Sequence, residues 1–157
     1  MKIELLLSGK TDFEYLKTGI SLYEKRLKHY CTYNRKEIPE LKQASSLKEN
    51  QIKEKEGELI LKNIAEQDVL ILLDQRGDQI TSEEFALQLE NMAVRGIKKV
   101  IFTVGGAYGF SEKVYERANG KISLSNMTFS HQMVRLIFTE QLYRAFTIIK
   151  GEPYHHK

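Results

Sequence analysis

Short apolar runs alternate with amphipathic stretches along the whole chain, and this pattern constrains the fold more than any other feature. The strand-like runs lie at residues 2–9, 32–39, 68–74, 98–106 and 120–125. Between and after them, apolar residues recur at spacings of three and four, which is the period of one helix face. Strands that alternate with helices favour a parallel sheet covered by helices on both faces. We therefore expect one α/β domain over residues 1–157, with five strand–helix units.

Local signals predict where several of these elements begin and end. Three pairs have the spacing of a capping box, in which a hydroxyl and an acidic side chain close a helix start: Thr11 with Glu14, Ser46 with Glu49 and Thr81 with Glu84. The run QRGDQI at 75–80 predicts a turn after the third strand. Gly151 is expected to end a long last helix that begins near residue 131.

The composition excludes some classes of protein. A chain of 157 residues is long enough for one domain with a real core. No apolar run approaches the roughly 18 residues of a membrane span, and the N-terminus, which carries Glu4, does not read as a signal peptide. The single cysteine, Cys31, cannot form an internal disulfide, which fits a reducing compartment. These features predict a cytoplasmic protein with no membrane partner.

The placement of charge leaves two interpretations open. The whole net charge of +3 lies within residues 121–157, where three of the four histidines also occur. A local basic surface would attract a polyanion such as a nucleic acid. The alternative is that the excess of basic side chains in residues 121–157 belongs to a helix with ordinary surface charges.

Three strand ends predict where a ligand binds, because open parallel sheets bind ligands beyond the carboxyl ends of their strands. The third strand ends at Leu73 and Asp74, the fourth at Gly105 and Gly106, and the fifth at 124–126. If these strands are neighbours in the sheet, the three loops line one pocket.

The loop TVGGAYGF at 103–110 does not fit the known phosphate-binding patterns. Its glycines follow the fourth strand with the spacing G-G-x-x-G, whereas the dinucleotide fingerprint needs G-x-G-x-x-G after the first strand. A Walker loop needs a lysine after its last glycine, and none follows here. A tight strand-to-helix turn, in which glycine supplies a positive φ, remains the alternative to a ligand site.

The segment after the fifth strand is rich in small polar side chains, namely Ser125, Asn126, Thr128 and Ser130. They offer hydrogen-bonding groups at a helix start, although redundant N-caps would give the same pattern. The helix that follows is apolar on nearly all sides, which indicates burial on two sides and a partner subunit at the chain end. Within it, Glu140 and Arg144 have the spacing of an ordinary helix ion pair.

Metal and serine-hydrolase chemistry lack support in the sequence. His155 and His156 are adjacent in a short tail, with no cysteine or carboxylate cluster beside them, so we expect no metal. No serine lies on a G-x-S-x-G elbow.

Four stretches together resemble one family. They are VGGAYGFS at 104–111, LSNMTFSHQMVRLIFTEQLYRAF at 124–146, the terminal PYHHK and KEKEGE at 53–58. Over its full length the chain is similar to the RlmH family of small bacterial SPOUT-class methyltransferases, which methylate N3 of a pseudouridine in large-subunit (23S) ribosomal RNA. The resemblance implies a SPOUT-type α/β fold with a C-terminal trefoil knot, and a homodimer packed through the last helix.

The resemblance also implies the site residues. S-adenosylmethionine would be held at positions that match the family's cofactor loops, which are Leu73, Gly105, Leu124, Ser125, Asn126, Met127, Thr128 and Phe129. The tail with Tyr154 and His155 would complete the partner's active site. Our hypothesis for catalysis is that Arg144, Tyr154 and His155 favour the deprotonated base and hold RNA phosphate. Ala107 and Tyr108 depart from the commonest family pattern, so no side-chain role is carried over to them.

Two rival functions follow from other interpretations of the same residues. A non-catalytic ribosome-binding protein could keep the fold without the reaction. A nucleotide-dependent dehydrogenase is the other alternative, although the glycine pattern does not fit it.

Overall fold

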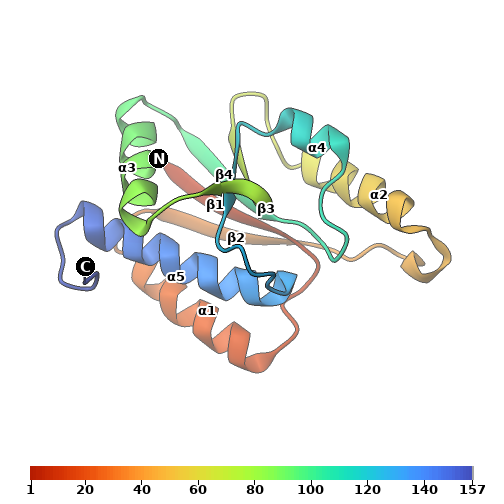
Figure 1. Cartoon of the computed structure of the whole chain (residues 1–157), viewed down its shortest axis with the longest axis horizontal. Helices are drawn as coiled ribbons and strands as arrows, with labels where there is room; N and C mark the ends of the chain where they lie inside the picture. Colours follow the sequence, from red (N-terminus) through yellow and green to blue (C-terminus); the bar gives the residue numbers. More distant parts are fainter. Residues whose placement is uncertain (157) are drawn as a thin grey trace.

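The computed structural model describes residues 1–156, and its strands and helices alternate along the chain (Figure 1). The strands are β1 (Lys2–Ser8), β2 (Thr32–Ile38), β3 (Val69–Gln79), β4 (Lys99–Val104) and β5 (Gly120–Ser123). The helices are α1 (Glu14–Leu27), α2 (Glu49–Leu61), α3 (Ser82–Val94), α4 (Glu112–Arg117) and α5 (His131–Ile149), with a 3₁₀ turn at Ala44–Ser46.

The five strands form one parallel sheet in the order β2-β1-β4-β3-β5. The α/β class with a parallel sheet is therefore confirmed. The more polar strand β2 lies at an edge, where side chains on alternate residues remain exposed. The order also makes β4, β3 and β5 neighbours, which is the condition for a single pocket at their carboxyl ends.

Helices cover both faces of the sheet, as the sequence pattern predicted. On one face, α1, α3 and α5 pack over a cluster that includes Leu5 and Phe102. On the other face, α2 and α4 cover Leu6 and Leu72 (Figure 1). Leu5 and Leu6 are adjacent in β1 and fully buried on opposite faces, because successive strand residues point to opposite sides of a sheet.

One of the three predicted capping boxes is present. The Thr81 hydroxyl accepts from the Glu84 amide at 3.1 Å, and Glu84 accepts from the Thr81 amide at 2.7 Å. The box at Thr11 is wrong, since α1 begins after Phe13 and the Thr11 hydroxyl instead contacts Glu37 and the Arg135 guanidinium. The box at Ser46 is also wrong, because this hydroxyl donates within the 3₁₀ turn and α2 begins three residues later.

The turn predicted at 75–80 is wrong, because β3 continues through it to Gln79. The second half of the strand pairs with β5 after a register shift between Leu73 and Asp78. Gly77 lies so close to β5 that a Cβ atom there would be 2.5 Å from the carbonyl carbon of Ile122. A glycine that served as a turn signal therefore permits close contact between two strands.

The last helix, α5, is anchored by a fully buried arginine. Arg135 donates to the backbone oxygens of Ser8 and Gly9 at 2.9 and 3.1 Å, so it ties α5 to the end of β1. The helix packs against α1 and α3, and Gly151 closes it with φ +68° as predicted. Its own neighbours thus cover much of the apolar surface for which the sequence predicted a partner subunit, and the homodimer stays a prediction.

The trefoil knot that the resemblance implies stays a prediction, since strand order and pairing alone do not trace how the chain threads. No helix within residues 1–156 combines the length and apolarity needed to cross a membrane.

Candidate active site

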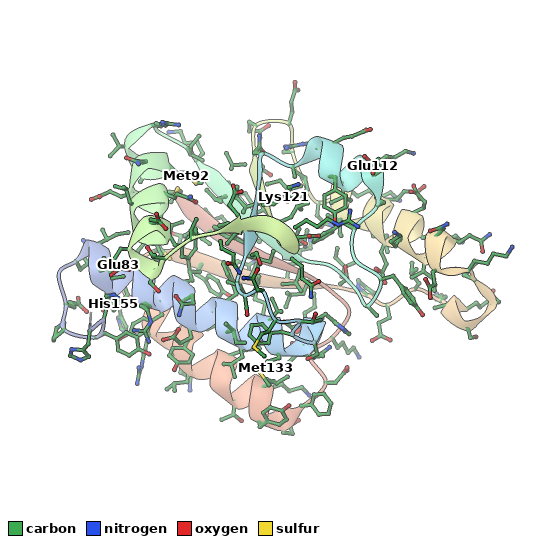
Figure 2. The ribbon with its side chains drawn as sticks, viewed as in Figure 1. Glu83, Met92, Glu112, Lys121, Met133 and His155 are labelled. Atoms are coloured by element: carbon green, nitrogen blue, oxygen red, sulfur yellow. The ribbon has the colours of Figure 1, made fainter. Side chains whose placement is uncertain are left out.

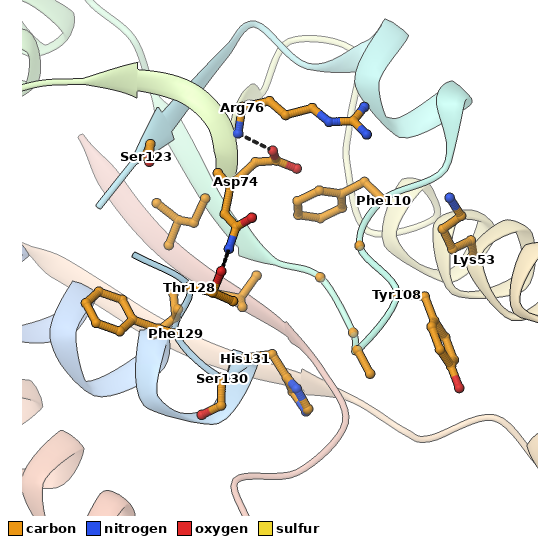
Figure 3. A pocket seen from close by; sticks show the side chains of 18 of the residues that line it. Lys53, Asp74, Arg76, Tyr108, Phe110, Ser123, Thr128, Phe129, Ser130 and His131 are labelled. Carbon is orange, nitrogen blue, oxygen red and sulfur yellow. Dashed lines mark hydrogen bonds between the residues drawn. The ribbon is translucent and has the colours of Figure 1, made fainter. Parts of the chain in front are cut away.

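Residues 73–76 within β3 and the loops after β4 and β5 line one cavity of about 750 Å³ at the carboxyl edge of the sheet (Figure 3). Seven of the eight predicted cofactor residues line it, namely Leu73, Gly105, Leu124, Ser125, Met127, Thr128 and Phe129. The eighth, Asn126, lies exposed in the same loop but outside the lining. The single pocket predicted at these positions is therefore present, although β3 does not end at Leu73 and Asp74 but continues to Gln79 after a register shift. We call this cavity the three-loop pocket.

The glycine loop forms a tight turn in one wall of the three-loop pocket. The Gly109 amide donates to the Gly106 oxygen at 3.1 Å, and Gly109 has φ +82°. A Cβ atom at Gly105 would lie 3.3 Å from both the Gly109 backbone and the Phe110 ring. The tight turn and the ligand site, which the sequence left as alternatives, are therefore compatible. The turn itself exposes glycine backbone to the cavity.

The segment between β5 and α5 holds its shape through local hydrogen bonds. Ser125 accepts from the Met127 amide at 2.9 Å, and Ser130 alone caps α5 by accepting from Met133 at 3.1 Å. Thr128 accepts from the Gln75 side chain at 2.7 Å, which joins this segment to the middle of β3 (Figure 3). Redundant capping therefore does not explain Ser125, Thr128 and Ser130, since each of these hydroxyls accepts a different hydrogen bond.

An acidic corner lies at the β3 end of the three-loop pocket. The Asp74 carboxylate accepts from the Arg76 amide at 2.7 Å (Figure 3). It also accepts from the Tyr115 hydroxyl. Burial and the hydrogen bond to Asp74 raise the pKa of Tyr115 to about 12, so the phenol stays protonated. The Lys121 ammonium lies 5.7 Å from the centre of the Tyr115 ring. These contacts fix the carboxylate at the cavity wall.

Helix α2 supplies a wall that sequence reasoning missed. Asn50, Lys53 and Glu54 line the three-loop pocket, although the charged first half of this helix predicts a solvated surface. The glycine inside the helix, Gly57, was the available signal, because an interior helix glycine often marks close packing. A Cβ atom there would lie 2.3 Å from the Ser111 hydroxyl oxygen, so α2 sits directly on the start of α4.

The three predicted catalytic residues lie together, but not at the three-loop pocket of their own chain. Arg144 donates to His155 Nδ1 at 3.3 Å, and its guanidinium carbon lies 4.8 Å from the centre of the Tyr154 ring. Arg144 is thirteen residues beyond His131, which lines the pocket, so about 20 Å of helix separates them. We call Arg144, Tyr154 and His155 the tail cluster.

The tail cluster is held by carboxylates from two helices. Glu140 accepts from Arg144 Nε at 3.1 Å and from the Tyr154 hydroxyl at 3.0 Å, which includes the ion pair that the sequence spacing predicted. Glu83, at the start of α3, accepts from His155 Nε2 at 3.0 Å (Figure 2). The hydrogen bond to Glu140 raises the pKa of Arg144, so the guanidinium stays protonated.

Comparison with known proteins places the chain in a family. A family model described as "Predicted SPOUT methyltransferase" matches residues 1–155. The chain belongs to the SPOUT methyltransferase family. It is 55% identical over 157 residues to a protein of Christiangramia forsetii, 53% to one of Parabacteroides distasonis and 52% to one of Flavobacterium johnsoniae, with all of each chain covered. Each of these relatives is named "Ribosomal RNA large subunit methyltransferase H".

Family membership confirms the resemblance drawn from the four sequence stretches, and with it the SPOUT fold class and the methyltransferase activity. It argues against the dehydrogenase alternative. Within residues 1–156, no group of three or more histidine, cysteine or acidic side chains is arranged to hold a metal ion. The roles assigned to individual pocket and tail residues stay predictions.

Proposed function

We propose that this protein transfers a methyl group from S-adenosylmethionine to N3 of a pseudouridine in the ribosomal RNA of the large subunit. The names of relatives 52–55% identical to it over their full length support large-subunit ribosomal RNA as the substrate. The RlmH resemblance supports the base and the nitrogen. The observation that carries the proposal is the three-loop pocket, which lies where this family's cofactor loops are expected.

The residues of the three-loop pocket fit this methyl donor. Its volume of about 750 Å³ lies within the range of about 300–1,000 Å³ typical of ligand sites. Leu73, Leu124 and Phe129 offer apolar walls for a purine, and Gly105 offers backbone without a side chain. Asp74 places a carboxylate at the wall, which suits a cationic ligand. When bound, the sulfonium supplies an activated methyl group.

The chain's own contribution is alignment and charge. A reaction with a good leaving group needs the two reactants held in contact, and the hydrogen-bonded loops around the pocket provide a fixed geometry for that. The imide nitrogen of the acceptor must also lose its proton. A secure guanidinium such as Arg144 favours the resulting anion if it lies nearby.

Because the tail cluster lies about 20 Å along α5 from its own pocket, we propose that it acts in the pocket of a second copy. The homodimer implied by the resemblance supplies that arrangement. Each site then combines the three-loop pocket of one protomer with Arg144, Tyr154 and His155 of its partner. The basic charge of residues 121–157 would lie beside the RNA at the same place.

Two measurements test the proposed function. Calorimetry should show binding of S-adenosylhomocysteine, and labelled S-adenosylmethionine should transfer methyl to large subunits or whole ribosomes from a strain that lacks this gene. Mass spectrometry should locate the label on N3 of a pseudouridine. Ribosome binding without transfer would instead favour the non-catalytic binding protein.

A further inference from the structure

A second cavity of about 370 Å³ lies beside the three-loop pocket, at the carboxyl ends of β1 and β2. Its floor includes Ser8 and Gly9 from the end of β1, and Glu56 of α2 forms one wall. Nothing in the proposed function uses this space. We call it the β1 cavity.

The β1 cavity and the three-loop pocket share a rim. Four residues line both of them, namely Gly106, Ala107, Tyr108 and His131. Figure 3 shows Tyr108 and His131 extending beyond the glycine loop and the start of α5, on the side away from Asp74. A molecule in the β1 cavity would therefore lie across the glycine loop from a molecule in the three-loop pocket, with the shared rim as their point of contact.

Two buried polar atoms at the β1 cavity have no hydrogen-bond partner among residues 1–156. They are Oε2 of Glu56 and the hydroxyl oxygen of Ser8, and both residues line the cavity. Buried polar groups are nearly always paired, so these two atoms have hydrogen-bonding capacity that a molecule in the cavity can use. Burial raises the pKa of Glu56, in keeping with a carboxylate that lacks a donor.

The glycine loop is shaped around this carboxylate. A Cβ atom at Gly106 would lie 2.4 Å from Glu56 Oε2, so the absence of a side chain lets the carboxylate reach the loop. The neighbouring glycine, Gly105, is the one predicted to face the cofactor. Gly105 lines the three-loop pocket alone, whereas Gly106 lines both cavities.

The chemistry of the β1 cavity selects a neutral ligand that donates hydrogen bonds. Acidic side chains at Asp12, Glu40 and Glu56 outnumber the one basic side chain, Lys10, so a phosphate group is disfavoured. Burial and the Arg135 guanidinium lower the pKa of His131, which favours a neutral imidazole at the rim. Tyr108 is 46% exposed there and offers an aromatic face for stacking.

We propose that the β1 cavity receives the base of the acceptor nucleotide, with the Glu56 carboxylate accepting a hydrogen bond from a ring N–H. A pyrimidine-type base carries the N–H donors and the flat face that this lining suits. The inference rests on the proposed function and adds to it the position of the second reactant. It gives Tyr108 a role as a stacking surface.

The experiment measures each ligand separately. Binding of S-adenosylhomocysteine is followed by calorimetry, and binding of the nucleoside pseudouridine to the donor-analogue complex is followed by saturation-transfer NMR. The variants are Glu56→Ala and Ser45→Trp, which places a large side chain in the cavity lining. Glu58→Ala is the matched control, because Glu58 lies exposed on the same helix and lines neither cavity. The control ligand is 1,3-dimethyluracil, which has no ring N–H.

The proposal predicts that pseudouridine binds the parent and the Glu58→Ala protein, and that both cavity variants weaken this binding by about tenfold or more. S-adenosylhomocysteine should bind all four proteins within about twofold, and 1,3-dimethyluracil should bind weakly to all. Unchanged pseudouridine binding in Glu56→Ala, or none in the parent, would overturn the proposal. A loss of donor-analogue affinity in Glu56→Ala would also overturn it, because the carboxylate would then belong to the cofactor. Failure of the parent to bind S-adenosylhomocysteine would instead contradict the proposed function itself.

Discussion

The two ends of α5 are built in opposite ways. At its start, the three-loop pocket and the β1 cavity present bare backbone, exposed apolar side chains such as Met127, and the unpaired carboxylate oxygen of Glu56. At its end, each polar group of the tail cluster has a partner within the chain, supplied by Glu140 and Glu83. One end has unmet hydrogen-bonding capacity, and the other has almost none.

This difference suggests separate roles for the two ends of α5: the start binds ligands, and the end contacts the ligand site of another copy. Unpaired groups and open backbone cost stability unless a ligand completes them. A polar cluster whose hydrogen bonds are all satisfied within its own chain is rigid, so it keeps its geometry at an interface. We infer that the start of α5 holds the reactants, and that the end of α5 delivers a preassembled charge to another copy.

Removal of residues 153–157 should have the largest effect. It deletes Tyr154 and His155 and leaves the three-loop pocket intact, so we expect methyl transfer to fall by at least about 10³-fold. Calorimetry should show S-adenosylhomocysteine binding within about twofold of the parent. A truncated protein that methylates ribosomes at the normal rate would show that the tail is dispensable.

A smaller effect is expected at the carboxylate that holds His155. Glu83→Ala should lower kcat by about tenfold with little change in donor affinity, because His155 loses one of its two side-chain contacts. Glu90→Ala, at an exposed position on the same helix, serves as the control.

A double-mutant cycle separates a positioning role of Glu83 from a merely structural one. If Glu83 acts through His155, Glu83→Ala should cause no further loss of kcat in a His155→Ala background. Losses that multiply would mean that Glu83 acts independently of the tail.

At the pocket end, the hydrogen bond between Gln75 and Thr128 can be tested directly. Thr128→Val keeps the shape of the side chain but removes the acceptor, so the segment before α5 is no longer joined to β3. We expect S-adenosylhomocysteine affinity to fall by about fivefold, the value of one ordinary hydrogen bond. Thr128→Ser should restore it. Equal affinities for the valine and serine variants would mean that this bond does not order the pocket.

The smallest effect is expected on stability. Glu56→Ala removes a buried carboxylate oxygen that has no partner, so the melting temperature should rise by roughly 2–4 °C if about 1 kcal/mol is recovered. Glu140→Ala, which breaks the contacts of the tail cluster, should lower it. The contrast fails if both substitutions change the melting temperature in the same direction.

The sequence predicts most of the fold because its dominant signals are local. Alternating apolar runs and helical periodicity indicate the parallel sheet, and Thr81 with Glu84 forms the expected box. Thr11 has the same local pattern but fails, because Arg135, far along the chain, uses its hydroxyl. The extension of β3 past Leu73 is missed for a similar reason, since it depends on pairing with β5.

The candidate site is predictable where it follows from strand ends and hidden where it depends on packing. The order of β4, β3 and β5 places the predicted cofactor loops together. Glu56 is missed because nothing in a charged helical segment distinguishes a carboxylate that faces a cavity from one in water. The separation of the tail cluster from the pocket of its own chain is likewise visible only in three dimensions. In the sequence the two motifs are neighbours, but they lie at opposite ends of α5.

The most direct test of the account is a mixing experiment with two inactive variants. Arg144→Ala removes the guanidinium of the tail cluster, and Gly105→Trp fills the three-loop pocket. In a mixed dimer, one site combines an intact pocket with an intact tail from the other chain. After the two variants are unfolded and refolded together, the account predicts methyl transfer at about a quarter of the parent rate, from the half of dimers that are mixed and carry one intact site each. Activity that stays at the level of either variant alone would contradict a site shared between two copies.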